Sequence, residues 1–204
     1  MAYTGGPLNV LNETLGITKS YKSVSVMELI KVHKPKSKDE LVDLIKYHYE
    51  NDCECGIKSK GTIEDFGKNL YDAQQPFWKE YKFSLKECTQ WVYNLVIVKS
   101  LKGSKMERKA TQELSKLLPD YQVSETNLIL DKDFRVDLVV SKGKVEICGI
   151  QVKPTSFKGV PKEIKEYNKK ANKKWGKPVF YLYYDRNDIF ININDKVEKI
   201  LNLT

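Results

Sequence analysis

Residues 137–153 read DLVVSKGKVEICGIQVK and predict a β-hairpin. Two apolar runs rich in β-branched residues flank the polar segment SKGK at 141–144, which contains the glycine that a hairpin turn needs. We therefore expect a first strand over residues 135–140 and a second strand over residues 145–153.

Three polar side chains should meet at one end of this hairpin. Side chains in a strand alternate between faces, so Gln151 and Lys153 project from the same side. Asp137, on the first strand, should lie close to Gln151. At a strand end we expect Asp137 and Lys153 to be partly exposed. Singly, such residues are more often solvent-facing than catalytic, but together they indicate a site for a divalent metal.

The spacing of these residues carries a family resemblance. Asp137, thirteen intervening residues and then Gln-x-Lys, within GIQVKP at 149–154, resemble the PD-(D/E)XK nuclease superfamily, which includes most type II restriction endonucleases. Val136 stands where proline is common, and Gln151 replaces the second acid, as in a minority of active members. The resemblance extends over residues 103–185, and length and motif favour the MjaI type.

The resemblance implies a type II restriction endonuclease that cleaves double-stranded DNA with Mg²⁺. Asp137 would bind the metal, and the Val152 carbonyl would add a ligand. Gln151 would supply a neutral oxygen ligand or a hydrogen bond to a metal-bound water. Lys153 would orient and help deprotonate the attacking water, or neutralise the scissile phosphate. Two alternatives remain: another nuclease of the superfamily, for repair or junction resolution, and a DNA-binding protein with a decayed site, which Gln151 favours.

A further carboxylate is expected from the helix before the sheet. Restriction endonucleases often carry an acid there, and Glu107 follows Gly103 in the matching place. Because Gln151 is neutral, Asp137 alone would hold the ion with a single negative charge, so Glu107 would strengthen binding of a hard cation. Glu113 competes for this role, and both could be solvated helix charges.

Composition favours a soluble protein with a polyanionic partner. Its 204 residues carry 35 basic and 27 acidic side chains, a formal charge of +8. No signal peptide or membrane-spanning run is evident, and the four cysteines suit reduced thiols in a cytoplasm. A palindromic target would require a two-fold homodimer.

The order of expected elements places a mostly helical half, residues 1–102, before an α/β nuclease core, residues 103–204, in one compact unit. The core would be a small mixed sheet flanked by helices. Residues 1–20 read as loop. Expected helices cover residues 24–33, 37–50, 62–75 (ending at Pro76), 84–101, 104–118, 161–175 and 196–201, and expected strands outside the hairpin cover 122–130, 179–184 and 189–193.

Lysines recur at spacings of three and four residues along the helix predicted at 161–175. On one helical face they would track DNA phosphates, with contacts from the preceding loop. Glu163 and Glu166 dilute this charge, so a merely solubilising face is the alternative. The DNA-binding candidates are Thr155, Ser156, Lys158, Lys162, Lys165, Lys169 and Lys173. The first half is expected to supply base recognition and dimer contacts.

Zinc is not expected from the sequence. His48, Cys53 and Cys55 are potential ligands, but Cys-x-Cys lacks the usual spacing of zinc fingers. Cys88 lies in an apolar helical stripe, and His48 falls on the buried face of its predicted helix.

Overall fold

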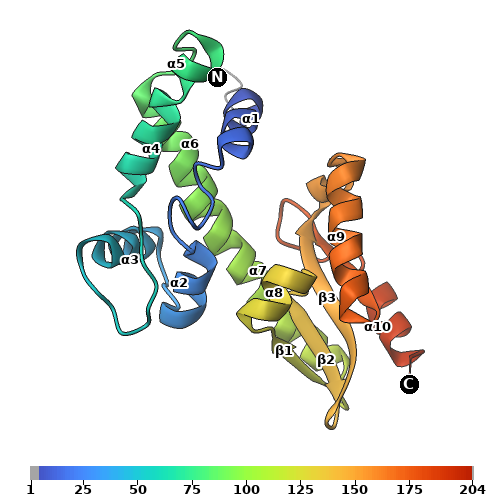
Figure 1. Ribbon diagram of the computed structural model, residues 1–204. Coiled ribbons are helices and arrows are strands. Elements are labelled where there is room, and N and C mark those ends of the chain that lie inside the picture. Colours follow the sequence, from blue (N-terminus) through green and yellow to red (C-terminus); the bar gives the residue numbers. More distant parts are fainter. Residues whose placement is uncertain (1–4, 204) are drawn as a thin grey trace. The chain divides into compact units, whose positions relative to one another are not determined.

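The structure is a computed structural model that describes residues 5–203, and it divides between Lys102 and Gly103 into two compact units. The fold is mixed α/β: the first unit is helical, and the second contains a mixed four-stranded sheet (Figure 1). Within the described residues, no helix is both long and apolar enough to cross a membrane.

The first unit packs short helices around a single apolar core. Serine and threonine caps set several helix starts: Ser37 Oγ accepts from the Glu40 amide at 3.1 Å, and Thr62 and Ser84 form capping boxes. The helices are α1 (Gly5–Leu15), α2 (Val26–His33), α3 (Lys38–Glu50), α4 (Ile63–Asp72), α5 (Gln74–Trp78) and α6 (Leu85–Tyr93), followed by the π-helical segment η1 (Asn94–Lys99).

Three expectations for the helical half are wrong. Residues 5–15 form α1 instead of loop, with Leu8 and Leu11 fully buried, while residues 1–4 lie outside the described part. Pro76 lies inside α5, because a proline in the first turn of a helix removes no intrahelical hydrogen bond. Gly103 does not interrupt the chain: α7 (Ser100–Leu117) runs through it, since an interior glycine costs a helix only about 1 kcal/mol.

The second unit is built on a sheet with the order β1-β2-β3-β4. The first three strands are antiparallel, and β4 is parallel to β3 through a helical crossover. After α7 the elements are β1 (Gln122–Glu125), α8 (Leu128–Phe134), β2 (Leu138–Lys142), β3 (Val145–Pro154), the 3-10 helix η2 (Thr155–Gly159), α9 (Lys162–Trp175), β4 (Val179–Tyr184) and α10 (Ile193–Leu201).

The expected strands are partly wrong at their ends. The strand expected over 122–130 stops at Glu125, because Asn127 caps α8 by accepting from the Leu130 amide at 3.0 Å. Arg135, with φ +56°, closes α8, so β2 begins only at Leu138. The strand expected at 189–193 is reduced to a bridge between Phe190 and Tyr184.

The two faces of β3 have different surroundings. Cys148, Ile150 and Val152 belong to the same buried cluster as Met106, Ala110 and Leu114 of α7. On the opposite face, a Cβ at Gly149 would lie 2.9 Å from the Trp175 ring and 2.8 Å from Val136. Glycine therefore lets Trp175 of α9 rest on the strand, on the face that carries Gln151 and Lys153.

Candidate active site

The hairpin brings Asp137 against the end of β3. The Asp137 amide donates to the Ile150 carbonyl at 2.9 Å, and its carboxylate Oδ2 accepts from the Val152 amide at 2.7 Å. The Lys153 Nζ lies 3.3 Å from the same oxygen. Three of the sequence-predicted residues, Asp137, Gln151 and Lys153, are therefore gathered around two adjacent strands.

Asp137 is buried, contrary to the expectation of a partly exposed strand end. It is 6% exposed, whereas the Lys153 side chain is 23% exposed and reaches solvent. Asp137 lies just before β2, and both its amide and its carboxylate are hydrogen-bonded to β3. Burial raises the pKa of the Asp137 carboxyl; the Lys153 ammonium offsets part of that rise, and the charge of Asp131 adds to it.

Gln151 supplies an oxygen that the protein itself leaves unused. The residue is 1% exposed, and among residues 5–203 its Oε1 has no hydrogen-bond partner. Leaving a buried acceptor without a donor costs about 1–3 kcal/mol of folding free energy, and binding of a ligand to that atom would offset the cost. Val152 and Lys153 both engage Oδ2 of Asp137, so its Oδ1 is a second oxygen of the kind that Mg²⁺ prefers.

The Val152 backbone is oriented toward the same place. Its amide donates to Asp137, and the N–H and C=O of one strand residue point toward the same neighbouring strand. We therefore expect the Val152 carbonyl on the Asp137 side of β3, while the Val152 side chain is buried in the core on the α7 face.

The two candidate acids on α7 have different surroundings. Glu107 is half-buried beside the core residue Met106, and its carbonyl accepts from Thr111 Oγ1 at 3.0 Å. Glu113 lies 3.5 Å from Lys109, which also donates to the Asp188 carbonyl at 2.6 Å. Glu113 is thus engaged in an ion pair toward the loop after β4. A metal-supporting role for Glu107 stays a prediction.

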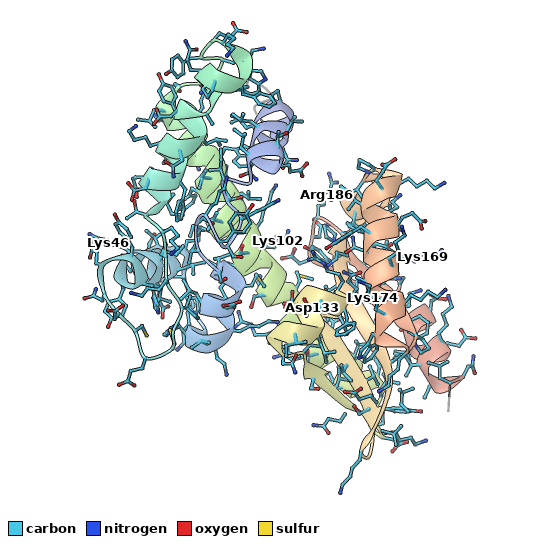
Figure 2. The ribbon with its side chains drawn as sticks, in the orientation of Figure 1. Lys46, Lys102, Asp133, Lys169, Lys174 and Arg186 are labelled. Carbon is cyan, nitrogen blue, oxygen red and sulfur yellow. The ribbon has the colours of Figure 1, made fainter. Side chains whose placement is uncertain are left out.

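A basic cleft of about 470 Å³ opens between α9 and β4. In the parallel register of β3 and β4, Gln151 is opposite Tyr181 and Lys153 is opposite Tyr183, so the cleft adjoins the Asp137 cluster. Its cationic lining comes mainly from α9, whose lysine side chains are drawn in Figure 2. The lining residues are Phe157, Lys165, Glu166, Lys169, Asn172, Lys173, Lys177, Val179, Tyr181 and Tyr183.

The predicted DNA-binding residues are only partly gathered there. Lys165, Lys169 and Lys173 line the cleft, whereas Lys162 is an exposed residue at the start of α9 and is not among the lining residues. Lys158 lies at its edge, with Nζ 4.8 Å from the Tyr183 ring centre. The remaining two candidates follow Lys153 in η2, where Thr155 is half-buried and Ser156 exposed.

Sequence reasoning missed the aromatic floor of the cleft and one lysine. Tyr181 stacks between Phe157 and Tyr183, with ring centres 5.9 and 6.1 Å away. The spacing of Tyr181 and Tyr183, which puts both on one face of a strand, could have revealed them. Lys177 also lines the cleft, but its ammonium is paired with Glu146.

One protein-family model matches almost the whole chain. The family is described as MjaI restriction endonuclease, and the match covers residues 7–194, which include most of both units. No curated protein and no solved structure matched.

Proposed function

Since the chain belongs to the MjaI restriction endonuclease family, we propose that it is a cytoplasmic type II restriction endonuclease of the PD-(D/E)XK superfamily. It would hydrolyse double-stranded DNA at a short palindromic sequence in an Mg²⁺-dependent reaction. The observation that carries this proposal is the unpaired, buried Gln151 Oε1 beside the Asp137–Lys153 ion pair, next to a basic cleft. The chain order also supports the superfamily assignment: α7 precedes strands β1, β2 and β3, and α9 connects β3 to β4 in the same mixed sheet.

The proposed roles follow from the chemistry of each group. Asp137, Gln151, the Val152 carbonyl and Glu107 would hold Mg²⁺. When bound, Mg²⁺ supplies a Lewis acid that offsets the charge developing on the phosphate and the leaving oxygen. Lys153, kept in place by Asp137 Oδ2, would orient and help deprotonate the attacking water, or neutralise the scissile phosphate.

The cleft would bind the DNA backbone. Lys165, Lys169 and Lys173 would neutralise phosphates, which binds all sequences alike. Burial raises the pKa of Tyr181, with the charges of Tyr183 and Asp137 adding to the rise, and burial also raises the pKa of Tyr183. Both hydroxyls therefore keep their protons at neutral pH. The Tyr181 hydroxyl donates to Asn172 Oδ1 at 3.3 Å, and the Tyr183 hydroxyl can donate to a phosphate oxygen.

We also propose a homodimer in which each subunit cuts one strand, with base recognition and dimer contacts supplied by the first unit. A palindromic site presents the same bases twice, related by a two-fold axis, which a symmetric pair of subunits can read. Sedimentation equilibrium should give twice the mass of one chain. A truncated protein that no longer dimerises should cut only one strand of the duplex.

Digestion of a plasmid tests the activity against its alternatives. With Mg²⁺, the protein should cut the plasmid into discrete fragments of double-stranded DNA. A smear would indicate a nonspecific or structure-selective nuclease of the same superfamily, and tight binding without cutting would indicate a decayed site.

The lysines of α9 allow a charge-matched test of the cleft. Replacing Lys169 and Lys173 with alanine should weaken binding to every duplex and reduce the slope of log affinity against log salt by about 2, because two phosphate contacts are lost. Replacing Lys170 and Lys174 removes the same charge from exposed positions outside the cleft lining, so the slope should stay near that of the wild type. Equal slopes for the two double variants, measured by fluorescence anisotropy, would contradict the proposal.

Gln151→Glu should restore the usual acid and keep cleavage. The new carboxylate would lie buried near Asp137, so the two like charges would raise each other's pKa until metal binds. We expect tighter metal binding at alkaline pH, an acid limb of the pH–rate profile moved to higher pH and an altered preference between Mg²⁺ and Mn²⁺. Gln122→Glu, the same change at an exposed position of β1, should alter none of these. A folded Gln151→Glu protein that is inactive with both metals would refute the ligand role.

A further inference from the structure

Four metal-ligating side chains converge in the first unit. The ligand atoms of His33, His48, Cys53 and Cys55 all lie within 4.8 Å of one another. His33 is the last residue of α2, His48 belongs to α3, and the two cysteines come from the loop before α4. Both thiols are free, and the cluster contains no carboxylate.

The two histidines are arranged as ligands rather than as ordinary core residues. His48 is fully buried, and its Nδ1 lies 2.7 Å from the Leu44 carbonyl, an acceptor that requires the proton on Nδ1. Its Nε2 is then a lone-pair donor, and it lies 3.2 Å from Cys55 Sγ. A backbone carbonyl behind a histidine is the support that zinc ligands usually have.

His33 has a ring nitrogen that the described part of the protein leaves unused. Its Nε2 is buried and, among residues 5–203, has no hydrogen-bond partner. Its ring meets that of His48 edge to face, with the centres 4.9 Å apart. A buried nitrogen without a partner is costly, whereas coordination to a metal would satisfy it.

We propose that His33, His48, Cys53 and Cys55 bind one structural zinc ion. Two thiolates and two imidazoles form a closed tetrahedral set that favours Zn²⁺ over Mg²⁺. With Zn–S near 2.3 Å and Zn–N near 2.0–2.1 Å, ideal N–S edges are about 3.6 Å, close to the separation of His48 Nε2 and Cys55 Sγ. The four ligand atoms lie up to 4.8 Å apart, so small side-chain movements would bring them to the distances of a tetrahedral site.

This proposal replaces the expectation of no zinc, which considered His48, Cys53 and Cys55 without His33. The Cys-x-Cys spacing argues against a zinc finger, but here the two other ligands come from separate helices. Cys88 is not part of the cluster: it is buried in the apolar core, with Gln74 Nε2 3.6 Å from its sulfur.

Zinc would connect the loop before α4 to the C-terminal ends of α2 and α3. Backbone hydrogen bonds tie the end of that loop to other segments: the Ser59 amide donates to the His48 carbonyl at 3.0 Å, and the Lys60 amide donates to the Ser23 carbonyl at 2.7 Å. The cysteines precede these contacts, so the metal would order the loop's first half. None of the ligands is a residue of the proposed nuclease site, so the zinc proposal does not depend on DNA cleavage.

Metal analysis of the untagged, full-length protein tests the site. Purified without chelator under reducing conditions, the wild type should contain one zinc per chain by mass spectrometry. Protein stripped of metal and refilled with Co²⁺ should show the intense visible bands of tetrahedral cobalt and a thiolate-to-cobalt charge-transfer band. Stripping should also lower the midpoint of thermal unfolding, and added zinc should restore it.

Variants assign the ligands. The Cys53→Ser, Cys55→Ser double variant should lose the zinc and the charge-transfer band, whereas Cys88→Ala, which removes a thiol from the core of the same unit, should keep both. Asp137→Asn should also keep its zinc, whatever happens to cleavage. Wild-type protein that takes up no zinc even after reconstitution, or a double variant that keeps one zinc per chain, would overturn the proposal.

Discussion

Replacing Asp137 with asparagine should abolish DNA cleavage and leave the protein at least as stable as the wild type at neutral pH. Asparagine keeps the shape and an oxygen to accept from the Val152 amide, but it removes the negative charge that we propose binds the metal. Loss of such an electrostatic group costs on the order of 10²–10³ in rate or more. Single-turnover cleavage of a plasmid at saturating Mg²⁺ measures the effect.

The stability of this variant follows from the direction of the pKa shift. Burial raises the pKa of Asp137 in the folded protein above its ordinary value of 3.8, even with Lys153 beside it. The ionised carboxylate therefore costs folding free energy at neutral pH, and this cost disappears as the pH falls through the raised pKa toward 3.8. Asp137→Asn should show its advantage in thermal unfolding at neutral pH and lose it in acid.

Asp133→Asn is the matched control. It makes the same chemical change at an exposed carboxylate of α8 (Figure 2) and should alter neither cleavage nor the pH dependence of stability. A folded Asp137→Asn protein that cuts DNA at the wild-type rate would show that the hairpin is only scaffold.

The sequence predicts the hairpin well because its signal is local. The alternation of side chains through Gln151 and Lys153, with a glycine turn between two apolar runs, predicts two adjacent strands and the shared face of these residues. It does not predict the register: β2 extends through Lys142 into the expected turn, and the pairing shifts between Val140 and Ser141. The same reasoning could not predict that Asp137 is buried, with its backbone and its carboxylate both hydrogen-bonded to β3. Tertiary context decides exposure at a strand end.

Features that combine distant residues were the ones missed. The cleft depends on Tyr181 and Tyr183 lying next to Gln151 and Lys153, which follows only from the parallel pairing of β3 with β4. His33 lies near the cysteines because α2 ends beside α3. The spacing of residues in the sequence does not predict this proximity. Turns and helix caps can be predicted because the residues that form them are neighbours in the sequence. Ligand sets and cleft linings combine residues that are far apart in the sequence, so local patterns do not predict them.

Lys153→Met should stop cleavage while leaving DNA affinity almost unchanged. Methionine keeps much of the length of the side chain but removes the charge that lies 3.3 Å from Asp137. A group that acts on the reacting water or the scissile phosphate should change the rate of the chemical step on the order of 10²–10³. Duplex affinity depends mainly on phosphate contacts elsewhere, so its dissociation constant should change little.

The same substitution should make metal binding more sensitive to acid. The Lys153 ammonium holds the Asp137 pKa below the value that burial alone would give, so its removal should raise that pKa further. Binding of Mg²⁺, followed by calorimetry, should then require a higher pH than in the wild type. Lys174→Met, an exposed α9 lysine outside the cleft lining, should cleave and bind metal normally. Normal cleavage by Lys153→Met would exclude this lysine from the reaction.

Lys153→Arg separates the two roles proposed for the lysine. A guanidinium keeps its proton at all accessible pH values, so it can neutralise a phosphate but cannot take a proton from water. Substantial cleavage by Lys153→Arg, with none by Lys153→Met, would assign Lys153 to charge neutralisation. If both variants are inactive while metal still binds in each, the result would favour an action of the Lys153 amine, in its neutral form, on the attacking water at the position that the Asp137 carboxylate gives it.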